Sequence, residues 1–172
     1  TPVLTDFCGL IYLVGFPFLL IFTFLVFLCA QNIEALKEYS ITFTLIYLIA
    51  YLFFIFFPVT VTGYVLPGMS PLLYQLNPAI LRIATTCSPG LNDCFPSLHA
   101  ALSVMATLYI IFKTDLKRYK VFAVLTTMLI LFAILYLGIH WITDMIGGTV
   151  LALIAYHITA LVSKKRFKNE SN

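Results

Sequence analysis

Two histidines and one aspartate stand out in a chain with few ionisable side chains. His99 lies in CFPSLHAALSVMA (94–106), and His140 and Asp144 lie in YLGIHWITDMIGG (136–148). If a helix begins near His140, an aspartate four residues later lies on the same face and can hold one imidazole nitrogen while the other stays free. A histidine held in this way can act as a covalent nucleophile. The spacing predicts that His140 attacks a substrate and that Asp144 orients the imidazole of His140.

His99 is suited to a complementary role. Pro96 and Ser97 mark the start of the helix that carries it, and the free N–H groups of a helix N-terminus attract anions. From that position His99 can donate a proton to a leaving oxygen. Two histidines, a carboxylate and a helix N-terminus together indicate a site for a phosphate ester.

The composition indicates the environment of this site. Hydrophobic residues make up 62% of the 172 residues, charged residues only 10%, and the mean hydropathy is +1.03. A soluble domain carries about a quarter charged residues. Since so few charges cannot cover a globule, the apolar surplus must face lipid, which excludes a soluble protein.

Five segments are apolar enough to cross a bilayer, and all must be helical because lipid satisfies no backbone groups. They are residues 10–30 (with a kink expected at Pro17), 41–57, 97–112, 121–138 and 141–162. The sequence therefore predicts an all-α integral membrane protein with five transmembrane helices, forming one membrane-embedded domain over residues 1–172.

The basic residues predict the orientation. Nine of the ten Lys and Arg residues fall after the first, third and fifth segments, which alternation places on one side. Cytoplasmic loops carry such an excess, so the tail 163–172 is expected in the cytoplasm. His99, His140 and Asp144 then face the periplasm, the cell exterior or an organelle lumen. These basic runs are topology signals, and no nucleic-acid site is indicated.

The long loop 58–96 is expected to hold two short interfacial helices. SPLLYQL and NPAILRIATT each place an N-cap residue, Ser70 or Asn77, before a proline. Arg82 lies in the second helix and is the only cation on the predicted outer side. It either reaches toward lipid headgroups or binds the phosphate of the substrate.

Two cysteines, Cys87 and Cys94, bracket the turn before His99. In an oxidising compartment they can form a disulfide that fixes this loop, or they can remain free as small apolar side chains. Their spacing is not that of a zinc motif. His157, deep in the last segment without a nearby acid, is expected to be a packed or headgroup-facing residue without a catalytic role.

Two other classes of protein stay open. A metal-dependent membrane hydrolase could use His99, His140 and Asp144 as zinc ligands, although the usual HExxH spacing is absent. A channel or assembly subunit would need polar residues along the spans, whereas the ionisable ones lie at one end. No cofactor and no resident metal are expected, and the oligomeric state is open.

The segments FPSLHAA and YLGIHWITDMIGG resemble the second and third signature motifs of the type 2 phosphatidic acid phosphatase (PAP2) superfamily. This resemblance implies a phosphohistidine on His140, with Asp144 as its orienter, His99 as the general acid and Ser97 on a phosphate oxygen. Family members usually have six spans, so the resemblance implies that the first helix is absent from this chain or is not needed. Gly147 and Gly148 are expected to allow close helix packing.

The sequence also departs from the phosphatase motifs. Leu98 stands where the phosphatases have Gly, Ile134 where they have Arg, and Ala133 where they have Ser, and Arg82 is not followed by Pro. The third motif is more similar to the inositol phosphorylceramide synthase-like branch. Two reactions on a lipid phosphate ester or diphosphate are therefore expected: hydrolysis by water, or transfer of a phosphorylated headgroup to a lipid hydroxyl.

Overall fold

The computed structural model describes residues 1–170, with side chains through Lys164, and every regular element in that range is helical. The elements are α1 (Pro2–Leu10), the π-helical segment η1 (Ile11–Gly15), α2 (Phe16–Cys29), α3 (Ile33–Phe56), α4 (Thr62–Val65), α5 (Leu72–Leu76), α6 (Pro78–Cys87), α7 (Leu98–Lys113), α8 (Lys117–Tyr136) and α9 (Ile142–Glu170). Within this described range the only β-pairing is an isolated bridge between Val59 and Asp93. The prediction of an all-α protein is confirmed.

Four helical stretches are long and apolar enough to cross a membrane: Pro2–Cys29, Ile33–Phe56, Lys117–Tyr136 and Ile142–Lys164. The fifth predicted span is α7, an apolar helix of only 16 residues. Its length is about 24 Å at 1.5 Å per residue, which is less than the hydrocarbon thickness. The count of five full-length spans is therefore not confirmed.

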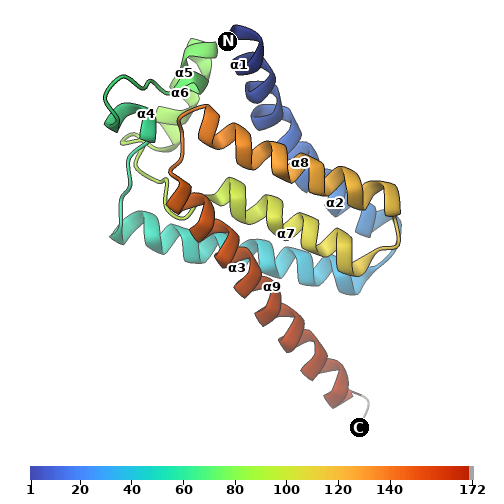
Figure 1. The fold of residues 1–172 in the computed structure, drawn as a ribbon. Helices are drawn as coiled ribbons and strands as arrows, with labels where there is room; N and C mark the ends of the chain where they lie inside the picture. Colours follow the sequence, from blue (N-terminus) through green and yellow to red (C-terminus); the bar gives the residue numbers. More distant parts are fainter. Residues whose placement is uncertain (171–172) are drawn as a thin grey trace.

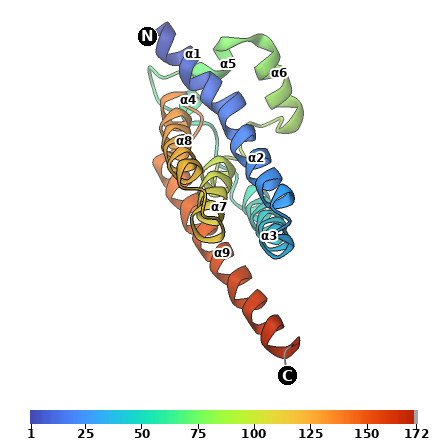
Figure 2. The same ribbon diagram turned by 90° about the vertical axis from the view of Figure 1, so that its right-hand side faces the viewer.

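The short helix α7 occupies the centre of the bundle. It packs against α2, α3, α8 and α9, and both views show it between these helices (Figures 1 and 2). Small side chains along it, including Ala100, Ala101 and Ala106, are fully buried and allow close approach of the neighbouring helices. Since α7 is covered by protein rather than lipid, it does not need to match the thickness of the membrane.

Near Pro17, where a kink is expected, the first helical stretch changes its helix type. Residues Ile11–Gly15 form a π-helical turn, and α2 resumes with Pro17 in its first positions. Proline has no N–H for a helical hydrogen bond and its ring crowds the preceding turn, so a local widening of the helix accommodates it. This turn carries Tyr12, which contacts the site described below.

The loop 58–96 forms α4, α5 and α6, which gather at the end of the bundle where the N-terminus also lies (Figure 1). Asn77 caps α6, its side chain accepting a hydrogen bond from the Ala79 N–H, and Pro78 begins the helix, as predicted. The prediction for Ser70 is wrong: α5 begins after Pro71 and has no side-chain cap, because Ser70 lies one residue too early.

The basic residues Lys113 and Lys117, at the end of α7 and the start of α8, lie at the opposite end of the bundle (Figure 1). There, Lys113 at the end of α7 forms an ion pair with Glu38 near the start of α3, with 2.7 Å between Nζ and Oε2. The final helix α9 runs past this end and away from the bundle (Figure 1). The expected tail 163–172 therefore continues the last helix as far as Glu170, and residues 171–172 lie outside the described range.

Candidate active site

His140 and Asp144 meet at the start of α9. The helix begins at Ile142, two residues after His140, so the pair does not share a helix face as expected. Instead His140 lies in the preceding turn, and its Nδ1 is 3.5 Å from Asp144 Oδ2. That oxygen also accepts a hydrogen bond from the Trp141 N–H at 2.8 Å. An acidic side chain in the first turn that bonds back to the residue before the helix stabilises the helix start.

His99 faces this pair from α7. The centroids of the His99 and His140 rings are 5.7 Å apart. Two aromatic rings from the first helical stretch also pack on His99, Tyr12 at 4.5 Å and Phe16 at 4.6 Å between centroids. The Nδ1 atoms of both histidines are buried and have no hydrogen-bond partner. The structure thus brings His99, His140 and Asp144 together in one largely buried cluster.

The starts of α7 and α9 are joined by backbone contacts. The Ser97 N–H donates a hydrogen bond to the carbonyl oxygen of Asp144 at 3.0 Å. Gly148, one turn further along α9, lies so close to Ser97 that a Cβ at this position would overlap the Ser97 carbonyl oxygen. Gly147 lies against the Phe95 ring in the same way, with 2.7 Å from an added Cβ to Cε2. Both glycines therefore permit the close packing that places His99 beside His140.

Ser97 and Arg82 have different positions relative to the cluster. Ser97 is fully buried and caps α7, with Oγ accepting from the Ala100 N–H at 3.3 Å. Its hydroxyl proton remains available to a phosphate oxygen. Arg82 lies on α6 and is exposed, and it takes part in none of the ring, ion-pair or hydrogen-bond contacts that join the cluster. The structure therefore does not bring Arg82 to the site.

The two cysteines considered for a disulfide are free thiols in the structure. Cys87 is exposed at the end of α6, whereas Cys94 is buried with its Sγ 3.5 Å from the Ile139 carbonyl oxygen. Cys94 belongs instead to a cluster with His140 and Asp144, in which one ligand atom of each lies within 4.8 Å of the others. Cys94 thus replaces His99 in the ligand set that the sequence suggested for a metal.

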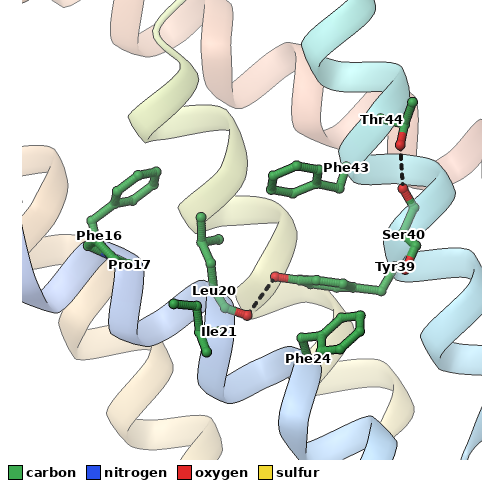
Figure 3. A pocket seen from close by; sticks show the side chains of 9 residues that line it. All are labelled: Phe16, Pro17, Leu20, Ile21, Phe24, Tyr39, Ser40, Phe43 and Thr44. Carbon is green, nitrogen blue, oxygen red and sulfur yellow. Dashed lines mark hydrogen bonds between the residues drawn. The ribbon is translucent and has the colours of Figure 1, made fainter.

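An apolar groove lies between α2 and α3 beside the site. Figure 3 shows Phe16, Leu20 and Ile21 of α2 on one side of it. The facing wall on α3 includes Tyr39 and Phe43 (Figure 3). The volume of the groove is about 490 Å³, and its lining is almost entirely apolar. Because Phe16 also packs on the His99 ring, the groove is separated from the histidine cluster by one side chain.

Sequence reasoning missed three residues around the histidines. Tyr12 and Phe16 carry no signal in a chain that is 16% aromatic. Trp141 is the single tryptophan and directly follows His140, so its position was a usable signal. Its Nε1 donates to the Thr60 carbonyl oxygen at 3.0 Å, which ties the turn of His140 to the loop after α3.

Comparison with known proteins gives one result. The family model described as the PAP2 superfamily matches residues 1–158, which includes the whole histidine cluster. No curated protein and no solved structure gave a match.

Proposed function

Because the chain belongs to the PAP2 superfamily, we propose that this membrane phosphatase-type protein acts on a lipid phosphate ester or diphosphate through a phosphohistidine at His140. The observation that carries the proposal is the buried pair of His140 and Asp144 facing the imidazole of His99. A nucleophile held by a carboxylate, with a second proton-transfer group beside it, is the arrangement that covalent catalysis requires.

In the proposed first step, Nε2 of His140 attacks the phosphorus atom and the bond to the leaving oxygen breaks. His99 gives a proton to that oxygen. Asp144, close to Nδ1, stabilises the positive charge that develops on the ring of His140. In the second step water or a hydroxyl group attacks the phosphohistidine, and His99 takes the proton back.

The start of α7 supports the phosphate oxygens in this proposal. Ser97 has a free hydroxyl proton, and the N-terminal N–H groups of a 16-residue helix favour negative charge. Arg82 has no part in it, because its exposed side chain on α6 contacts none of these residues.

The groove between α2 and α3 favours a lipid substrate. A lipid chain lying along Phe16, Leu20 and Phe43 (Figure 3) would bury apolar surface. Because Phe16 packs on the His99 ring, such a chain would end beside His99, where the phosphate is proposed to react. The polar cluster at one end of the bundle and the apolar groove along its side match the two halves of a phospholipid.

The acceptor and the orientation complete the proposal. Water as acceptor gives a phosphatase, and a lipid hydroxyl gives an inositol phosphorylceramide synthase-like transferase. The Gly147–Gly148 ending of the third motif favours the transferase.

The basic end of the bundle, with Lys113 and Lys117, is proposed to face the cytoplasm. In this orientation the site opens to the extracytoplasmic side and the C-terminus is cytoplasmic.

The test is a substrate panel with purified protein in detergent. Lipid phosphates, lipid diphosphates and phosphoinositol or phosphocholine lipids are offered with and without a hydroxyl acceptor lipid. Free phosphate establishes the phosphatase, and a new phospholipid without free phosphate establishes the transferase. Equal product from the parent and from His140→Asn would overturn the proposal.

A further inference from the structure

The thiol of Cys94 lies in the buried cluster, although the proposed phosphoryl transfer does not use it. Ligand atoms of Cys94, His140 and Asp144 lie within 4.8 Å of one another, and all three residues are buried. They offer a sulfur, an imidazole nitrogen and a carboxylate oxygen. Zn²⁺ is borderline-soft and binds these three donor types in tetrahedral sites, so this mixed set suits it.

An independent observation concerns Nδ1 of His140. This nitrogen is buried and has no hydrogen-bond partner, although Asp144 Oδ2 lies only 3.5 Å away. His140 is only 7% exposed, so water does not readily replace the missing hydrogen-bond partner. An unpaired buried polar atom costs free energy, and a cation bound between nitrogen, oxygen and sulfur would remove that cost.

We propose that Cys94, His140 and Asp144 form an inhibitory zinc site, with the fourth position of the ion open to water. A neutral imidazole carries one proton, so a zinc ion on Nδ1 leaves that proton on Nε2. The lone pair of Nε2 is then occupied and cannot attack phosphorus. Binding releases the thiol proton of Cys94 to solvent and transfers no electrons. The inhibition rests on the proposed function, whereas the binding of zinc does not.

Cobalt spectroscopy tests the binding without any substrate. The full chain in detergent, in chelator-treated buffer, is titrated with Co²⁺ and then with Zn²⁺. The parent should show a thiolate-to-cobalt charge-transfer band that zinc displaces. Cys94→Ser should lose this band and bind zinc at least about tenfold more weakly. Replacing even a residue that only contacts a metal ligand typically weakens metal binding by about that factor. Cys87→Ser, at an exposed cysteine, is the control and should keep both properties.

A parent protein without the thiolate band would overturn the zinc site. A Cys94→Ser variant that binds zinc as tightly as the parent would also overturn it. If Cys94→Ser elutes as an aggregate, Cys94→Ala replaces it in the same comparison. In the activity assay each variant is compared with its own zinc-free rate.

Zinc should inhibit the parent, a chelator should restore its rate, and the half-inhibitory zinc concentration should rise about tenfold in Cys94→Ser alone. Activation by zinc, or loss of activity in zinc-free buffer, would instead show a catalytic metal and overturn inhibition. A chain that shows the cobalt band but turns over no substrate would contradict the proposed function and leave the zinc site standing.

Discussion

The imidazole rings of His99 and His140 lie 5.7 Å apart, centroid to centroid, across the junction of α7 and α9. This distance depends on the packing of α7 against α9 and on the turn that carries His140, which Asp144 Oδ2 holds through the Trp141 N–H. The Ser97 N–H bonds to the Asp144 carbonyl oxygen at 3.0 Å, and the absence of a side chain at Gly148 lets the two backbones approach. The proposed nucleophile and acid are therefore positioned by the same contacts that hold the bundle together.

Asp144→Asn should lower the rate by about 10²–10⁴-fold while the protein stays folded, because the carboxylate that stabilises the charged ring of His140 is lost. The Asn side-chain oxygen can still accept the Trp141 N–H, so the start of α9 is preserved. Turnover of the best lipid phosphate and a thermal melt in detergent measure the two effects. Asp93→Asn, at an exposed carboxylate in the same region, is the control. A parental rate in Asp144→Asn would contradict the orienting role.

Gly148→Ala should destabilise the protein by about 1–3 kcal/mol, the usual cost of forcing extra atoms into a packed interior. The added Cβ overlaps the Ser97 carbonyl oxygen, so α7 and α9 must separate and the two histidines with them. Gly15→Ala is the matched control, since its Cβ would meet only the Ile11 side chain at 3.8 Å. Melting temperature and rate should both fall in Gly148→Ala, and unchanged values for both would refute the close contact.

Ile21→Trp should raise the KM for long-chain lipid phosphates several-fold and leave the turnover of a short-chain soluble analogue unchanged. Ile21 lines the groove between α2 and α3, and a larger side chain there reduces the space for a lipid chain. Ile55→Trp is the control, because Ile55 on α3 is about as exposed, 56% against 59%, but does not line the groove. Equal effects of the two substitutions would show that the lipid chain binds elsewhere.

Cys94 should resist alkylation by N-ethylmaleimide while Cys87 reacts. Burial, with the nearby negative charges of Asp144 and Asp93, raises the pKa of the Cys94 thiol to about 12. A raised thiol pKa means that the unreactive protonated form dominates near neutral pH. Peptide mass spectrometry after a timed reaction measures both sites. Fast labelling of Cys94 in the folded protein would contradict its burial.

The residue types predicted which side chains lie together better than they predicted the local geometry of those side chains. His99, His140 and Asp144 were recognised because ionisable residues are rare and costly in such apolar segments. His140 and Asp144 do not share a helix face, as a helix starting near His140 would require, because Asp144 Oδ2 bonds to the Trp141 N–H and the helix begins at Ile142. A carboxylate four residues after a histidine is compatible with a turn as well as with a helix.

Long-range packing was not predictable from one sequence. Tyr12 and Phe16 reach His99 only because the first helical stretch packs on α7, and nothing distinguishes them from the other aromatic residues. Arg82 was considered because it is the only cation on its predicted side, but α6 leaves it exposed outside the cluster. The N-cap at Asn77 was predictable because that interaction is local.

Trapping of the covalent intermediate tests the central claim most directly. The purified protein is mixed with a lipid phosphate labelled in its phosphate group, quenched within the first turnover, and analysed for acid-labile, alkali-stable phosphate on peptides. We expect the label on the peptide that contains His140. The His140→Asn variant should carry no label, and its turnover rate should fall by at least about 10⁴-fold. His157→Asn, at an exposed histidine of α9, should keep both. Phosphate release at the parental rate by His140→Asn, with no label on the parent protein, would contradict the account.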